Sequence, residues 1–582
     1  MRLPGWVTSG VLGLLLIGSA LDALVTRHAQ AAALDLAPDL ILHNGKIVTV
    51  DRTFSIARAV AIKDGRFVAV GDDQEVLALA GPGTTRRDLQ GRTVIPGLID
   101  SHNHMDGTGV TFIKPNPVGS RSIADIQRLI ADTAAKIPPG QWIVTARVST
   151  PTISLLLREK RFPTRQELDA AAPRHPVALL ATHALVLNSE GLRRVGIDKT
   201  TPHPKGGEVG VDPGTGEPDG RFYERPAMML VEPKLPPYVT YEDYLKAYAE
   251  AQRRYHAVGL TGVIIHGADW DSIRALRALR DRGELTIRTY VHWRWGEDLN
   301  ALSRETLERT IRSLSAISGA GLGDEWLKVA GIKVTLDGGV SIGTALTRTP
   351  YRTVSGHESH GIQLITTEKF RELAELCARY GLRLAVHDSG DRAMDVVFGV
   401  YEEVNRRHPL QPLRFVAVHA QIPDAGHMRQ VKALGLAVPT QPIFLYRLSE
   451  GYVKYLGKEL AERAFPIRSW LDQGVRVGLG SDSPVNTYDP IQGIAFAATR
   501  RTAAGQVMGA KEAISVEEAL RGYTINNAWI AMQETLRGSI EPGKLADLVV
   551  LSEDLLTVPK ERIKDIKVLL TMVGGKIVYE AR

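Results

Sequence analysis

Short apolar runs that alternate with helical patterns fill the middle of this 582-residue chain. Alternation of strands and helices indicates a parallel sheet with helices on its faces. Helical patterns such as Thr367–Tyr380 and Asp424–Leu434 separate some of the runs. Eight such units over this length predict a (β/α)8 barrel. The expected strands are Val94–Asp100, Gly262–His266, Ile287–His292, Leu327–Leu336, Leu384–His387, Phe415–His419, Ala437–Gln441 and Val475–Gly480.

The two ends of the chain carry a different pattern, that of β-hairpins. Two-residue turn signals lie between β-branched and apolar residues. A small set of hairpins cannot bury its own apolar face. We therefore expect both ends to meet in one small β-sandwich, with two unrelated terminal hairpins as the alternative. The turn signals are Asn44-Gly45 within Leu40–Asp51, Asp64-Gly65 within Ile56–Asp72, and Gly574-Gly575 within Val568–Tyr579, beside a predicted strand at Ala546–Leu551.

These patterns predict an α/β protein in which a barrel is inserted in a β domain. The composite β-sandwich would comprise residues 36–93 and 537–582, and the barrel residues 94–536. The connection after the first barrel strand is unusually long, at about 107–234, and contains segments rich in Pro and Gly. Insertions of this length often shape or cover a site.

The N-terminus has the layout of a secretory signal peptide. A basic residue, Arg2, precedes the apolar stretch Val11–Ala20 and the small residues of Ala29-Gln30-Ala31. The apolar run is short for a membrane span. We expect residues 1–31 to be removed and the protein to be periplasmic or secreted; an uncleaved anchor and a misassigned start are the alternatives. The single cysteine, Cys377, cannot form an internal disulfide.

Composition narrows the expected partners. The chain has 71 basic and 65 acidic residues, a net charge of +6 that is mild for this length. No run of Lys and Arg with interleaved aromatic residues is present, which disfavours nucleic-acid binding. We expect a small-molecule substrate, no nucleic acid and no membrane contact after signal cleavage. The sequence does not decide between a monomer and a homo-oligomer.

Two histidines one residue apart end the first predicted barrel strand. His102 and His104 point to the same face because side chains alternate along a strand. Two imidazoles aimed at one point are a common beginning of a metal site. The alternative is two polar residues beside a turn.

Four further polar residues lie where other apolar strands end, and active sites of (β/α)8 barrels lie at the carboxyl ends of the strands. Imidazole with carboxylate suits zinc or a similar divalent ion, with one or two ions per chain. The additional residues are Lys333, His387, His419 and Asp482.

Together these segments resemble the amidohydrolase superfamily, and within it the branch of YtcJ-like proteins and N-substituted formamide deformylase (amidohydrolase family 3). The resemblance extends from about Leu40 to the end of the chain. The segments that carry it are Pro96–His104, Gly331-Ile332-Lys333 with Asp337-Gly338, His387 with Gly390–Ala393, His419-Ala420-Gln421, Gly480–Pro484 and Gly538–Leu548.

The resemblance implies a role for each matching position. His102 and His104 would bind the more buried metal, and His387 and His419 the second. Lys333 would be carboxylated and bridge both metals. Its alternatives are an ordinary lysine, ion-paired for example with Asp337, and a site with a single metal.

The expected activity is hydrolysis of a non-peptide carbon–nitrogen bond, in an amide or formamide-like substrate, by a water that the metal activates. Asp482 would contact the first metal and shuttle the proton. An ester hydrolase or lyase on the same site, and a binding or regulatory protein on a retained barrel, are the alternatives. His266 and His292, which end strands two and three, and Tyr351 are candidate substrate contacts, with packing as the alternative for the histidines.

Overall fold

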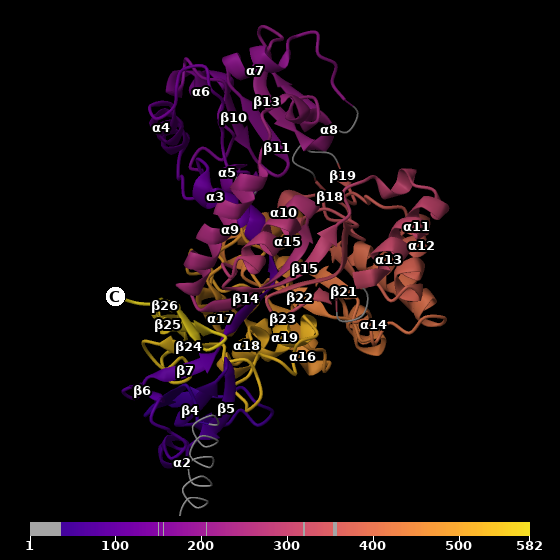
Figure 1. The fold of residues 1–582 in the computed structure, drawn as a ribbon. Helices are drawn as coiled ribbons and strands as arrows, with labels where there is room; N and C mark the ends of the chain where they lie inside the picture. Colours follow the sequence, from indigo (N-terminus) through magenta and orange to yellow (C-terminus); the bar gives the residue numbers. More distant parts are fainter. Residues whose placement is uncertain (1–36, 149, 155, 205–206, 318–320, 353–357) are drawn as a thin grey trace, which may run out of the picture.

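The structure is a computed structural model that describes residues 37–148, 150–154, 156–204, 207–317, 321–352 and 358–582. The expected signal peptide, residues 1–31, lies outside the described residues. Three parts are visible in Figure 1: a barrel in the centre, a β domain below it in which indigo and yellow strands lie together, and a purple lobe above it. No helix in the described part of the chain has the length and apolarity that a membrane crossing needs.

Eight parallel strands form the barrel and follow one another in chain order. The first six are neighbours in one sheet, and the last two pair with each other. Single β-bridges join the six-stranded part to the two-stranded part at both edges and close the barrel. They lie between Val416 and Ala437 and between Asn103 and Ser483. The predicted (β/α)8 barrel is confirmed. Its strands are β8 (Leu98–Asn103), β14 (Leu260–Ala268), β15 (Arg288–Arg294), β17 (Leu327–Thr335), β20 (Leu384–Asp388), β21 (Val416–His419), β22 (Val438–Thr440) and β23 (Val477–Leu479).

Apolar side chains on both faces of the barrel strands explain the uniformly apolar runs. In β20, Leu384 and Val386 pack outward against the helices, whereas Ala385 belongs to the cluster inside the barrel. Both predicted helices are present, as α12 and α14. The surrounding helices are α9 (Tyr241–His256), α10 (Trp270–Asp281), α11 (Arg304–Leu314), α12 (Thr367–Arg379), α13 (Asp391–Asn405), α14 (Ala425–Leu434), α15 (Phe444–Glu462), α16 (Ile467–Asp472), α17 (Pro490–Thr499), α18 (Val516–Gly522) and α19 (Ile525–Ile530).

Both ends of the chain build a β-sandwich, as the hairpin patterns predict. Apolar residues of the two sheets, such as Leu42, Ile47 and Leu548, share one core. One sheet has the order β5-β4-β1-β6 and the other β26-β25-β24-β7-β2-β3. The strands are β1 (Leu40–His43), β2 (Lys46–Val48), β3 (Ile56–Ala57), β4 (Ala59–Lys63), β5 (Arg66–Gly71), β6 (Thr85–Asp88), β7 (Thr93–Pro96), β24 (Leu548–Leu551), β25 (Val568–Val573) and β26 (Lys576–Glu580).

Two expectations about these strands are wrong. Val94–Asp100 is not one strand, because β7 lies in the sandwich and β8 in the barrel, with Gly97 between them. A Cβ at Gly97 would lie 2.3 Å from Oγ1 of Thr261, so the crossing requires glycine. Asn44-Gly45 is not a hairpin turn either: it carries the chain from β1 in one sheet to β2 in the other. The hairpins at Asp64-Gly65 and Gly574-Gly575 are confirmed.

The long insertion is a folded lobe rather than an extended loop. A five-stranded sheet lies between two layers of helices, and alternate residues of β10 face each layer: Leu179 packs on the side of α4, and Leu180 on the side of α7. Helix α5 contacts the short helix η4 (Val340–Ile342), which follows β17. The elements are α3 (Met105–Ile113), α4 (Ile123–Ala134), β9 (Ile143–Val144), α5 (Thr150–Ser154), α6 (Arg165–Ala171), β10 (Val177–Leu180), β11 (Ala184–Leu187), α7 (Ser189–Val195), β12 (Glu208–Val211), β13 (Pro218–Tyr223) and α8 (Glu224–Met228).

Candidate metal centre

The six predicted ligands all lie at the carboxyl ends of barrel strands. His102 is the penultimate residue of β8 and His104 follows the strand, Lys333 lies in β17, His387 in β20, His419 ends β21, and Asp482 follows β23. The imidazole rings form a continuous cluster: the centroid of His102 lies 5.1 Å from that of His104 and 4.9 Å from that of His419. The rings of His387 and His419 are 4.5 Å apart.

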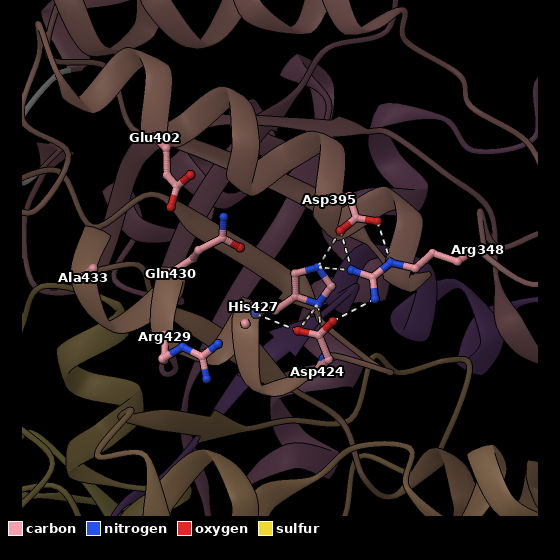
Figure 2. A pocket seen from close by; sticks show the side chains of 9 residues that line it. Arg348, Asp395, Glu402, Asp424, His427, Arg429, Gln430 and Ala433 are labelled. Carbon is pink, nitrogen blue, oxygen red and sulfur yellow. Dashed lines mark hydrogen bonds and ion pairs between the residues drawn. The ribbon is translucent and has the colours of Figure 1, made fainter.

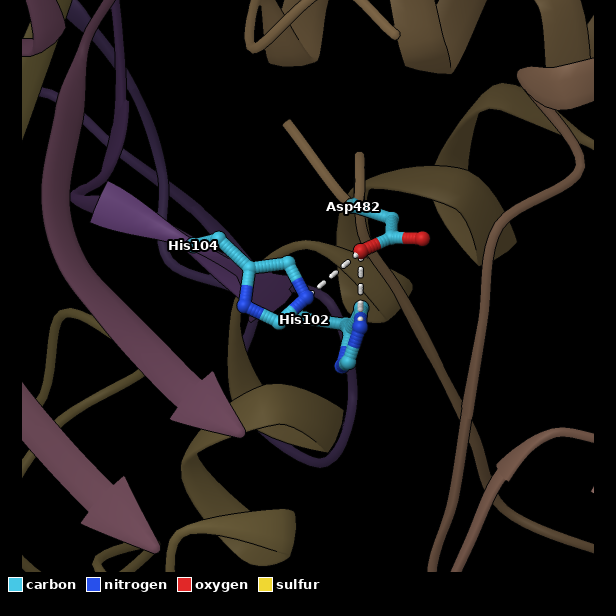
Figure 3. Close-up of side chains that lie close together, drawn as sticks. All are labelled: His102, His104 and Asp482. Carbon is cyan, nitrogen blue, oxygen red and sulfur yellow. Dashed lines mark ion pairs between the residues drawn. The ribbon is translucent and has the colours of Figure 1, made fainter. Parts of the chain in front are cut away.

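Three of these side chains converge on a single point (Figure 3). Nε2 of His102 and Nε2 of His104 lie 2.8 and 3.1 Å from Oδ1 of Asp482. Neither contact is aligned as a hydrogen bond, and this oxygen has no hydrogen-bond partner among the described residues. The three ligand atoms lie within 4.8 Å of one another. Two imidazole nitrogens and a carboxylate oxygen arranged in this way fit a divalent metal ion.

Burial keeps His102, His387 and His419 in the neutral form that a metal requires. Burial lowers the pKa of His102 to about 4 and that of His387 to about 3, in both cases with help from the charge of Lys333. Burial also holds the pKa of His419 well below its usual value. Burial would raise the pKa of Asp482, but His102 and His104 hold it well below its ordinary range. Neutral imidazole and ionised carboxylate are the binding forms.

Unusual backbone conformations aim two of these side chains. His419 has φ of 83° and Asp482 has φ of 54°, both in the left-handed region that non-glycine residues rarely adopt. In β21, Val416 and Val418 point into the barrel, so regular alternation would turn His419 outward. The positive φ instead brings its ring to the cluster. Such conformations cost about 1–3 kcal/mol each and gather at functional sites.

Hydrogen bonds on the far side of two histidines select the nitrogen that faces the site. Nε2 of His387 lies 3.1 Å from the carbonyl oxygen of Gly338, to which it can only donate, so Nδ1 keeps its lone pair. Nδ1 of His419 donates to Oε1 of Gln441 at 2.6 Å, which leaves Nε2 as the ligand atom. Gln441 was missed from the sequence, although it ends one of the predicted strands.

A buried carboxylate, Asp100, joins the first strand of the site to the last. Its Oδ1 accepts from the backbone N–H of His102 at 3.1 Å and of Ser481 at 3.0 Å. Its Oδ2 accepts from Nδ2 of Asn103 at 2.8 Å and from Oγ of Ser481 at 2.5 Å. Burial raises the pKa of Asp100 to about 6. This network fixes His102 relative to the residue that precedes Asp482.

Lys333 is buried beside the imidazole cluster without a hydrogen-bond or ion-pair partner among the described residues. Burial lowers the pKa of its ammonium to about 8; the charge of Asp482 opposes this shift and that of Arg294 adds to it. The proposed ion pair with Asp337 is not formed. Instead, Asp337 accepts from the backbone N–H groups of Leu346 at 3.0 Å and of Ser389 and Gly390 at 2.9 Å.

The three candidate substrate contacts are not among the residues whose ligand atoms converge. His266 stacks beneath His102 with centroids 5.0 Å apart, and His292 stacks on His266 at 4.7 Å. Both rings are buried, at 1% and 0% exposure. The hydroxyl of Tyr351 donates to the carbonyl oxygen of Ala345 at 2.7 Å. The structure gives these residues packing and hydrogen-bonding roles, and substrate contact stays a prediction.

A surface cavity of about 460 Å³ lies outside the centre, between α13 and α14 (Figure 2). Arg348 projects into it and pairs with Asp395 and Asp424, the latter at 2.7 Å. Nε2 of His427 lies 3.1 Å from Asp395. Because its charges are mutually paired, this network serves to hold the segment after β17 against the two helices.

Comparison with known proteins identifies the family of the chain. Residues 86–579 match the model of the amidohydrolase family. The chain is 31% identical to N-substituted formamide deformylase of Arthrobacter pascens, over 93% of this chain and 98% of that protein. It is 26% identical to putative amidohydrolase YtcJ of Bacillus subtilis, over 93% and 99%. A structure of an uncharacterized metal-dependent hydrolase from Pyrococcus horikoshii superposes with a TM-score of 0.70 at 23% identity, over 90% of this chain and 99% of that one.

The chain therefore belongs to the amidohydrolase family, as its motifs predict. It is an enzyme, a metal-dependent amidohydrolase that acts on carbon–nitrogen bonds of a small molecule.

Proposed function

We propose that this enzyme hydrolyses an N-substituted amide or formamide-like bond that is not part of a peptide backbone. The observation that carries the proposal is the convergence of His102, His104 and Asp482 at the carboxyl end of the barrel. The relative that is 31% identical along almost the whole chain is named an N-substituted formamide deformylase, which supports this bond type.

The donor set favours zinc. Imidazole and carboxylate are typical zinc ligands, and a bound zinc ion would lower the pKa of a water and polarise the carbonyl of the substrate. We propose two ions, the first at His102, His104 and Asp482 and the second at His387 and His419, with Lys333 between them as a carbamate. The lowered pKa of Lys333 supports this assignment, because carboxylation requires the neutral amine.

Asp482 is the proposed proton carrier. Its carboxylate is ionised and has one oxygen at the centre of the ligand set, so it can take the proton of the attacking water. The water oxygen bonds to the carbonyl carbon, and Asp482 then gives the proton to the nitrogen as the carbon–nitrogen bond breaks. The products are a carboxylic acid, or formic acid from a formamide, and an amine.

We further propose that the reaction takes place outside the cytoplasm. The signal-peptide layout of residues 1–31 supports export to the periplasm or the medium. Mass spectrometry of the N-terminus of the protein from a periplasmic extract tests this: a start near Ala31 is expected, and an intact Met1 would contradict it.

The first experiment is elemental analysis of the purified enzyme, handled without chelator, followed by amine-release assays on N-substituted formamides and amides. About two zinc ions per chain, with activity lost to chelator and restored by zinc, is the expected result. About one ion would remove Lys333 from the metal site. Full activity in thoroughly metal-free protein would contradict the proposed chemistry.

A further inference from the structure

Arg294, the last residue of β15, lies beside the proposed metal centre and is not one of its proposed ligands. It is in register with Lys333 on the neighbouring parallel strand, so the two side chains leave the sheet on the same face. Lys333 points into the barrel, where its charge acts on the histidines. Arg294 therefore projects over the same end of the barrel.

A glycine opens the space that Arg294 occupies. A Cβ at Gly267, which follows His266 in β14, would lie 3.3 Å from Nε of Arg294 and 3.7 Å from Cγ of Lys333. The side chains of Arg294 and Lys333 thus both pack against the backbone of Gly267. Gly267 has φ of 111°, so a larger residue would be strained as well as crowded.

The guanidinium of Arg294 is left available. Arg294 is exposed, and it has no ion pair and no side-chain hydrogen bond within the described part of the chain. The nearby acid Asp269 is engaged elsewhere: its Oδ1 caps α10 through the N–H of Ser272 at 2.8 Å, and its Oδ2 accepts from the hydroxyl of Tyr244 at 2.8 Å. A fixed cation at the rim of a catalytic centre is suited to an anionic group of the substrate.

We propose that Arg294 forms a carboxylate-binding subsite, so that the preferred substrate is an amide with a carboxylate near the scissile bond, as in an N-formyl or N-acyl amino acid. This inference rests on the proposed function. The planar guanidinium would hold the carboxylate in two parallel hydrogen bonds and place the amide carbonyl toward Asp482.

A matched pair of compounds tests the subsite: N-formylphenylalanine and its neutral C-terminal carboxamide, with formate release as the readout. The wild-type enzyme should favour the carboxylate in kcat/KM by about 10-fold or more. Arg294→Gln should lower kcat/KM for the carboxylate by about 10- to 100-fold, mainly through KM, and leave the carboxamide almost unchanged. Arg277→Gln, on the exposed face of α10, is the matched control and should alter neither substrate.

Equal losses of kcat/KM on both compounds in the Arg294→Gln variant would overturn the proposal. If the metal content of the variant fell as well, Arg294 would instead stabilise the carbamate of Lys333. Wild-type preference for the carboxamide would also overturn it. Calorimetric binding of N-acetylphenylalanine to the zinc-loaded protein separates this inference from the proposed function. Binding that Arg294→Gln abolishes, without any hydrolysis, would retain the subsite and reject the activity. Absence of binding to the wild type would reject the subsite.

Discussion

Two buried aspartates lie at opposite ends of the barrel and have opposite partners. At the amino end, Asp547 accepts two hydrogen bonds from Arg288, at 2.7 and 3.0 Å, and a third from the N–H of Gly574 at 2.8 Å. At the carboxyl end, Oδ1 of Asp482 lies 2.8 and 3.1 Å from the nitrogens of His102 and His104 and has no hydrogen-bond partner among the described residues.

The difference distinguishes a carboxylate that stabilises the fold, Asp547, from one that is available for metal binding, Asp482. A guanidinium is permanently cationic. The guanidinium of Arg288 forms a buried ion pair with the carboxylate of Asp547, and this pair joins β15 to the C-terminal strands. Of the two imidazoles beside Asp482, that of His102 is neutral because burial lowers its pKa to about 4, so its lone pair is available to a metal. Substitution at the two ends should therefore affect different properties of the enzyme.

The largest expected effect is on activity, from Asp482→Asn. The amide keeps the size of the side chain but cannot accept the proton of the water. We expect kcat to fall by about 10³-fold or more while the melting temperature changes little. Steady-state kinetics, with metal analysis of the same sample, is the measurement. A variant that retains full activity and its metal would exclude Asp482 from proton transfer.

At the opposite end, Asp547→Asn should affect stability instead. The substitution leaves Arg288 buried without its anion, next to Arg537, whose pKa burial lowers to about 9. Breaking a buried ion pair from one side costs about 3–5 kcal/mol in the free energy of unfolding. Urea denaturation measures the loss, and kcat per folded molecule should stay unchanged. Arg288→Met should cost less, because Arg537 still faces Asp547; an equal or larger cost would contradict this account.

The same comparison shows what the sequence could predict. The six proposed ligands were found because parallel strands bring their carboxyl ends together, so a polar residue at the end of an apolar run identifies one rim of the barrel. The rule uses only local pattern and chain direction. It could not find Arg288 and Asp547, which are 259 positions apart and meet only when the chain ends return to the barrel.

Other residues were missed or misread for related reasons. Gln441 ends a predicted strand and Arg294 lies two residues beyond one, but Gln and Arg are common on protein surfaces and carry no metal signal of their own. Asn44-Gly45 has the chemistry of a hairpin turn, yet the residues of a turn do not determine which strands pair beyond it. The sequence Val94–Asp100 resembles one continuous strand because almost all of its residues are apolar. They are apolar because both the sandwich sheet that contains β7 and the barrel sheet that contains β8 bury them.

A smaller effect at the catalytic end is expected for Gln441. Its Oε1 accepts from Nδ1 of His419 and thereby fixes the nitrogen that faces the site. Gln441→Met removes the acceptor with little change in volume and should reduce zinc affinity or activity by about 10- to 100-fold. Gln441→Glu retains an acceptor and should retain most of both. Zinc titration with a chromophoric chelator measures the affinity, and equal behaviour of the two variants would refute the positioning role.

The smallest expected effect is pH-dependent and belongs to the amino end. His256, at the end of α9, is buried with both ring nitrogens bonded, to the carbonyl of Leu260 and to Oγ1 of Thr286, and burial lowers its pKa to about 4. Between pH 6.5 and pH 4 the unfolded chain binds the proton first, so stability is full above pH 6.5 and falls with acidification.

This loss should reach about 2 kcal/mol at pH 5. His256→Gln has no proton to gain and should show a smaller drop in melting temperature between pH 7.5 and pH 5 than the wild type, although it is less stable at pH 7.5. Both proteins are compared in the zinc-loaded form, so that the state of the metal site at the carboxyl end of the barrel is the same in each. Parallel curves for both proteins would mean that acid sensitivity arises at the metal centre rather than at the end of the barrel where Asp547 lies.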